Sequence, residues 1–108
     1  MILELPVTAI PNQRFSVELD KQQVDIELRQ IGKALMASLW IDEVSVFQNS
    51  ICGYHARLGQ YASNLFSGAL FFHDTLGTTD PSYEGLGVRY KLYFVSADDA
   101  FYQKVISV

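Results

Sequence analysis

Apolar and polar residues alternate strictly over positions 14–19 and 24–29, and this pattern constrains the fold more than any other part of the sequence. Apolar side chains occupy every second position in two runs on either side of the link DKQQ: Phe15, Val17 and Leu19, then Val24, Ile26 and Leu28. A period of two is typical of strands that bury one face and leave the other in water. Two such runs around a short polar link predict an antiparallel hairpin. We expect all four residues of DKQQ to form the link, because Lys21 is a poor substitute for glycine at a left-handed turn position.

A second hairpin is predicted after Gly32 from the runs ALMASLWI and VSVFQN, which are joined by Asp42 and Glu43. A two-residue turn at this point sets the expected register, with Ile41 opposite Val44, Leu39 opposite Val46, and Ala37 opposite Gln48. The other face of this hairpin then carries Met36, Trp40 and Phe47. That face needs cover, either from another layer of the same fold or from a partner subunit.

The rest of the chain also favours strands over helices. Residues 50–66 have a loose helical spacing that Gly53 and Gly59 interrupt, so we expect an irregular segment with at most one helical turn. The run GALFFH (68–73) predicts a strand that is apolar on both faces, and VRYKLYFV (88–95) predicts one with a single apolar face made of Val88, Tyr90, Leu92 and Phe94. Together these runs predict an all-β fold, a small antiparallel β-barrel or sandwich of about six to eight short strands.

Length and charge exclude several classes of protein. A chain of 108 residues fits one domain with a modest core, and 49% apolar with 19% charged residues is typical of a folded chain. The net charge of −4 gives no electrostatic drive toward DNA or anionic lipid. The N-terminal stretch MILELPVTAIPNQ is broken by Glu4, Pro6 and Pro11, so we predict neither a signal peptide nor a membrane span. Cys52 is the only cysteine, which excludes an internal disulfide and favours synthesis in a reducing cytosol.

Two histidines are the first candidates for chemistry. His73 and Asp74, with Ser67 nearby, suggest a catalytic triad, but adjacent residues of a strand point to opposite faces. We therefore expect a polar strand end. His55 and His73 suggest a metal site, but they lack both a spacing motif and a clear carboxylate partner.

The stretch FFHDTLGTTDPSYEGLG (71–87) collects acids and glycines without the spacing of a known site. Asp74, Asp80 and Glu84 lack the alternating pattern of a calcium loop, and no glycine-lysine-serine ending or following helix makes a phosphate loop. Cys52 lies between apolar and small neighbours and is expected to be a buried core residue rather than a nucleophile. The aromatic residues near the C-terminus have too few cations around them for a nucleic-acid stacking platform. We predict a protein that is not an enzyme and needs no cofactor or metal.

Two blocks of the sequence resemble a known family. The blocks IPNQRFSVELDKQQVDIELRQIG and DPSYEGLGVRYKLYF, in this order and in a chain of this length, resemble the baseplate plug family of contractile-tailed phages. The Leu-Gly-arginine loop of that family corresponds to Leu86, Gly87 and Arg89. The sequence departs from the family pattern at Lys21 and Glu43, where glycine-like turn positions are usual, and the middle segment matches poorly.

The resemblance implies a structural protein of the virion. It implies a plug subunit of the tail baseplate, made in the host cytoplasm, which packs near the end of the tail tube with hub and spike proteins and with other copies of itself. It implies no cofactor and no catalytic residues, while the net charge and the lack of a membrane span predict no membrane partner and no specific nucleic-acid binding. A stand-alone β-module that binds a small ligand or sugar remains the alternative, because tyrosines and a tryptophan are expected at the surface beside acids.

We expect a barrel-like plug domain over residues 1–95 and a β-rich tail over residues 96–108. The tail either forms the last strand of its own sheet or reaches as an arm onto a neighbouring subunit. The predicted partner interface combines surface aromatics with the loop of the second block: Trp40, Phe47, Asp80, Tyr83, Leu86, Arg89, Phe101 and Tyr102.

Overall fold

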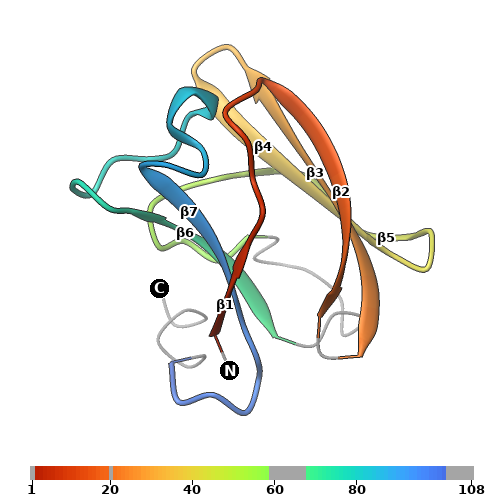
Figure 1. Ribbon diagram of the computed structural model, residues 1–108. Coiled ribbons are helices and arrows are strands. Elements are labelled where there is room, and N and C mark those ends of the chain that lie inside the picture. Colours follow the sequence, from red (N-terminus) through yellow and green to blue (C-terminus); the bar gives the residue numbers. More distant parts are fainter. Residues whose placement is uncertain (1, 20, 59–67, 102–108) are drawn as a thin grey trace.

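The computed structural model describes residues 2–19, 21–58 and 68–101, and these form an all-β sandwich (Figure 1). One antiparallel sheet has the order β2-β3-β4-β5, with β2 (Asn12–Leu19), β3 (Gln22–Ile31), β4 (Ala34–Ile41) and β5 (Val44–Ile51). The other, also antiparallel, has the order β1-β7-β6, with β1 (Ile2–Leu5), β7 (Tyr90–Val95) and β6 (Ala69–Asp74). Within the described residues the two sheets do not close into a barrel, so the predicted all-β fold takes its sandwich form.

The first hairpin has a shorter link than the sequence predicts. β2 and β3 pair out to Leu19 and Gln22, so only residues 20–21 join them, and Lys21 adopts a φ of 67°. The expectation of a four-residue link was therefore wrong. A left-handed residue costs about 1–2 kcal/mol. The longer pairing offsets this cost because it adds ladder hydrogen bonds and places Leu19 fully in the core.

The second hairpin keeps the predicted turn but not the predicted register. Ile41 pairs with Val44 around Asp42 and Glu43, as expected, and both turn residues adopt positive φ angles. Beyond the turn the register shifts, which pairs Leu39 with Phe47 and Ala37 with Ser50 instead of Val46 and Gln48. One consequence is that Phe47 packs against the core, so its predicted place on the outer face with Trp40 was wrong.

Two register shifts change the pairing of the second hairpin, the first between Trp40 and Leu39 and the second between Leu39 and Ala37, and Asn49 lies at the second. Asn49 adopts a φ of 52°, and its backbone N–H donates a hydrogen bond of 3.0 Å to Oγ of the buried Ser38. Extra residues on one strand turn the following side chains onto the other face. An alternation pattern alone does not predict such an insertion.

Strand β6 is buried on both faces, as its sequence predicts. Leu70 and Phe72 face the main core, whereas Ala69 and Phe71 belong to a second cluster with Val95. Phe71 is only 4% exposed, because Tyr93 and Phe101 pack on this outer side of the sheet. The chain therefore covers Phe71 itself.

The outer edge of β6 is closed by a strap, residues 54–58. The N–H groups of His55 and Leu58 donate hydrogen bonds of 2.9 Å to the carbonyl oxygens of Phe72 and Leu70. Sheet edges without such cover are templates for pairing with other chains. The strap thus protects β6 and fixes the position of His55.

The main core lies between the sheets and contains the alternating residues of the first hairpin. Val24, Ile26 and Leu28 of β3 are at most 1% exposed, and they meet Leu92 and Phe94 of β7, which are fully buried. Cys52 also lies in this core, and burial raises the pKa of its thiol, in agreement with the predicted role in packing. No helix in the described part of the chain combines the length and apolar character that crossing a membrane requires.

Candidate contact loop

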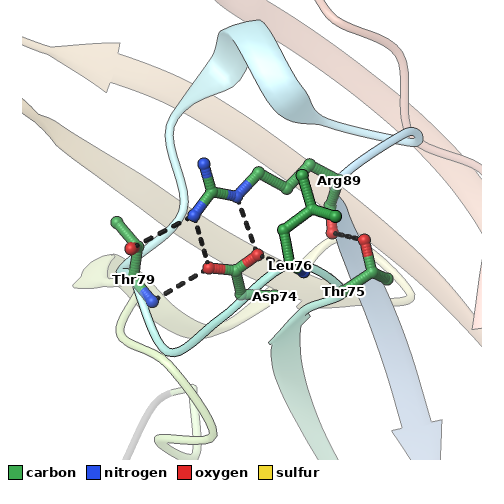
Figure 2. Close-up of polar contacts among 5 residues, drawn as sticks. All are labelled: Asp74, Thr75, Leu76, Thr79 and Arg89. Carbon is green, nitrogen blue, oxygen red and sulfur yellow. Dashed lines mark hydrogen bonds and ion pairs between the residues drawn. The ribbon is translucent and has the colours of Figure 1, made fainter.

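A long loop, residues 75–89, joins β6 to β7 and is held at its base by an ion pair (Figure 2). The Asp74 side chain has no exposed surface, and Arg89 binds it through two hydrogen bonds, Nε to Oδ1 at 2.7 Å and Nη2 to Oδ2 at 2.8 Å. The N–H groups of Leu76 and Thr79 also donate to this carboxylate, at 2.9 and 3.0 Å. We call this arrangement of Asp74 and Arg89 the clamp.

The charge distribution of the clamp follows from these contacts. Hydrogen bonds from Arg89 lower the pKa of Asp74 well below its ordinary value, and the two backbone N–H groups lower it further. Asp74 in turn raises the pKa of Arg89. Two fork-like hydrogen bonds define both the distance and the angle between the groups. The clamp therefore fixes where the loop leaves β6 and where it enters β7.

A second set of contacts ties the far half of the loop to the other sheet. The N–H of Tyr83, in the short 3₁₀ turn η1 (Tyr83–Gly85), donates to Oε1 of Gln30 on β3 at 3.1 Å. Leu86 is 1% exposed and belongs to the main core, and Pro81 is also buried. Gly87, with a φ of 80°, passes so close to Val7 that an added Cβ would lie 2.5 Å from its carbonyl oxygen. These contacts make the loop a shaped and supported structure.

Two apolar side chains nevertheless point away from this supported loop. Leu76 and Val88 are each 78% exposed, more than any other large apolar side chain in the described residues. They lie at the same end of the molecule, because Thr75 next to Leu76 donates two hydrogen bonds of 2.9 Å to the carbonyl oxygen of Arg89, next to Val88. We call these two exposed side chains, Leu76 and Val88, the loop tip; both lie close to the clamp residues in the sequence. Val88 was predicted to face the core with Tyr90, and that was wrong because β7 begins only at Tyr90.

The predicted interface residues of the loop have different surroundings. Arg89 belongs to the clamp, Asp80 accepts a hydrogen bond of 2.9 Å from the N–H of Tyr54, and Tyr83 is half-buried against the core. Leu86 is part of the core, so its side chain is not available to a neighbouring protein. The sequence pattern did not predict that Leu76 and Val88 are exposed. Their exposure depends on where β6 ends, at Asp74, and where β7 begins, at Tyr90.

The predicted interface residues outside the loop do not form one surface with it. Trp40 is half-buried on the outer face of β4, and the guanidinium of Arg14 lies 4.4 Å from the centre of its ring. Phe47 packs against the core, and Phe101 lies on Phe71 with a ring distance of 5.5 Å. Tyr102 and the rest of the predicted tail lie outside the described residues.

The two histidines are brought together by the strap. Nε2 of His55 lies 2.8 Å from Nδ1 of His73, a hydrogen bond between residues 18 positions apart. Tyr54 stacks on His55 at 4.0 Å, and Phe71 meets the same ring edge-on at 5.8 Å. Burial lowers the pKa of His55, and the charge of the neighbouring His73 lowers it further.

The pKa of His55 gives a prediction for stability. Because that pKa is lower in the folded protein, the unfolded chain binds a proton more readily as the pH falls below about 6.5. We expect the free energy of unfolding to decrease from pH 8 to pH 5. His55→Asn, which tolerates the local φ of 56°, should show a smaller decrease. Urea unfolding at several pH values measures this, and an equal decrease in both proteins would contradict it.

The other candidate chemistry is not assembled. His73 turns to His55 and Asp74 turns to Arg89, so these two adjacent side chains diverge as predicted, while Ser67 lies outside the described residues. Asp74 uses both carboxylate oxygens in the clamp, and Asp80 binds the Tyr54 N–H. Among the described residues, no three His, Cys, Asp or Glu side chains gather closely enough to hold a metal ion.

Comparison with known families identifies the chain. It matches the family described as cyanophage baseplate Pam3 plug gp18 over residues 2–98 of 108. The chain belongs to this baseplate plug family. No curated protein gives a significant match. The resemblance inferred from the sequence is thereby confirmed, and the matched range includes the clamp and the whole loop.

Membership in the baseplate plug family supports a structural role and a place in the tail baseplate of a virion. It also implies association with other baseplate components. For a member of such a family, a supported loop with an apolar tip is a feature suited to contact rather than catalysis. The residues Leu86, Gly87 and Arg89, on which the resemblance was based, serve to build that loop, since Leu86 enters the core, Gly87 passes Val7 and Arg89 closes the clamp.

Proposed function

We propose that this protein is a plug subunit of a contractile phage tail, which packs with the hub and spike proteins near the end of the tail tube. The observation that carries the proposal is the family match over residues 2–98. A plug subunit acts by contact rather than by catalysis, so it must present rigid surfaces of defined shape to several neighbouring proteins. The clamped loop is such a surface.

The described residues give weaker support to the sugar-binding alternative. Its motivation was surface tyrosines and a tryptophan with acids nearby. One face of Trp40 is covered by Arg14, which also forms an ion pair of 3.3 Å with Asp25. A sugar ring that stacked on this face would have to displace a cation–π contact worth about 0.5–1 kcal/mol. The assembly role therefore has the stronger support.

Deletion of the gene from the phage tests the proposed function. We expect tails without the protein to carry incomplete or unstable baseplates, because a subunit between hub and spike removes contacts to both when it is absent. Negative-stain imaging of purified particles measures the fraction of complete baseplates, and expression of the wild-type protein from a plasmid is the control. Intact, stable baseplates in the deletion particles would overturn the proposal.

A further inference from the structure

The loop tip is the strongest unexplained surface of the molecule. Single exposed apolar side chains are common on proteins and need no explanation. Here two belong to one loop, at 78% exposure each, and their sequence neighbours Thr75 and Arg89 are hydrogen-bonded, while the residues around Leu76 are small or polar: Thr75, Gly77, Thr78 and Thr79. The tip contributes little to its own fold, because most of both side chains remains in water.

The clamp gives this tip a fixed position. The N–H of Leu76 donates directly to Asp74, and Val88 is followed immediately by Arg89. The N–H of Val88 also donates to the carbonyl oxygen of Gly85 at 3.2 Å. A loop tip whose backbone is already ordered loses little conformational entropy when it binds. More of the free energy gained by burying its apolar surface therefore contributes to affinity than in a flexible loop.

Charges around the tip indicate which partner it fits. Asp74 is neutralised by Arg89, and Lys91, which binds the Gly87 carbonyl, forms an ion pair of 3.5 Å with Glu4. Two acids of the loop, Asp80 and Glu84, have no ion pair among the described residues. The same loop therefore carries two exposed apolar side chains and two acids without an ion pair.

A second copy of this chain is a poor partner for this surface. Each copy carries a net charge of −4, and two such loops would bring acids against acids. Like charges placed opposite each other across an interface suppress binding. A complementary partner has an apolar recess with lysine or arginine side chains at its rim.

We propose that Leu76 and Val88 insert into an apolar recess with a basic rim on a different baseplate protein, and that Asp80 and Glu84 pair with that rim. The inference rests on the proposed plug function and adds to it the contact face and the chemistry of the neighbour. The clamp acts here as a positioning device, since neither Asp74 nor most of the Arg89 fork is free to contact another protein.

The test is incorporation of variants into particles of the deletion phage. Leu76→Ser combined with Val88→Ser removes the apolar tip and should leave the melting temperature nearly unchanged, because both side chains are mostly exposed. We expect incorporation per tail, measured by quantitative mass spectrometry, to fall by more than about tenfold. Glu84→Lys should also reduce incorporation, because it places a cation against the basic rim.

A matched control uses other exposed apolar residues. Val44→Ser combined with Ile51→Ser changes side chains of β5 that are 55% and 66% exposed and lie in the other sheet. This variant should incorporate normally. Normal incorporation of the loop-tip variant would overturn the inference. The proposed plug function is tested separately, and it would still stand if the deletion phage lacked complete baseplates. Normal incorporation of Glu84→Lys would overturn the basic rim alone.

Discussion

Asp74→Asn is expected to lower the melting temperature by on the order of 10 °C. This decrease is larger than the one expected for Arg89→Lys, the other clamp variant. Asparagine keeps one oxygen acceptor but presents an amide N–H₂ to the Arg89 fork, which has only donors. The guanidinium then loses its charged partner, and the N–H groups of Leu76 and Thr79 compete for the remaining oxygen. The Arg89 side chain is 35% exposed, so water screens part of its unpaired charge, and most of the loss comes from the fully buried acceptor at Asp74. Thermal unfolding followed by circular dichroism measures the change.

Two further variants show whether the clamp itself is responsible. Glu84→Gln makes the same change of charge on the same loop at an exposed side chain, and its melting temperature should equal that of the wild type. Arg89→Lys keeps the positive charge but loses the two-pronged geometry, so it should fall between the wild type and Asp74→Asn. A melting temperature of Asp74→Asn within a few degrees of the wild type would contradict the assigned role.

The clamp also predicts that the stability of the protein depends on pH in the acidic range. The pKa of Asp74 is lowered in the folded protein, so its stabilising contribution is fully present above the ordinary carboxyl pKa of about 4 and is lost as the pH falls further toward the folded value. Wild-type stability should therefore decline below about pH 4 more steeply than that of Asp74→Asn. Other acids titrate in both proteins alike and cancel in the comparison.

The sequence predicted both hairpins and the buried face of the first, because alternation reports directly on which face is buried. Val24, Ile26 and Leu28 lie in the core as their period of two requires. The same logic failed at Phe47 and Val88, since one lies beyond a β-bulge and the other lies before its strand begins. Periodicity carries no information about an inserted residue or about the exact end of a strand.

The site was harder to predict because its contacts depend on the pairing of distant strands. Asp74 meets Arg89 only because β6 and β7 pair with His73 opposite Lys91, which sets the length of the loop between them. A local signal did exist: an aspartate at a strand end often accepts the N–H two residues later, as Asp74 does from Leu76. The approach of His55 to His73 has no local signal, because it depends on the strap bonding to the edge of β6.

Gly87→Ala is the second substitution for which we expect a large effect, a loss of about 2–4 kcal/mol in the free energy of unfolding. Two causes add at this position. The φ of 80° is unfavourable for any residue with a Cβ, and that Cβ would lie 2.5 Å from the Val7 carbonyl oxygen. The contact is to backbone, so no side chain can rotate away, and either the loop or the segment after β1 must move. Urea unfolding of the purified variant measures the loss.

Two other glycines separate these causes. Gly32→Ala introduces a Cβ at a φ of 61° with no atom within 4 Å, so it should cost only the backbone strain of about 1–2 kcal/mol. Gly77→Ala lies in the same loop as Gly87, has no left-handed φ and meets its nearest atom, Oδ2 of Asp74, at an ordinary 3.5 Å, so its effect should stay within about 0.5 kcal/mol. The expected order of destabilisation is Gly87, then Gly32, then Gly77. If Gly87→Ala cost no more than Gly32→Ala, the loop would not be held against Val7, and the support that positions Leu76 and Val88 would have to come from the clamp alone.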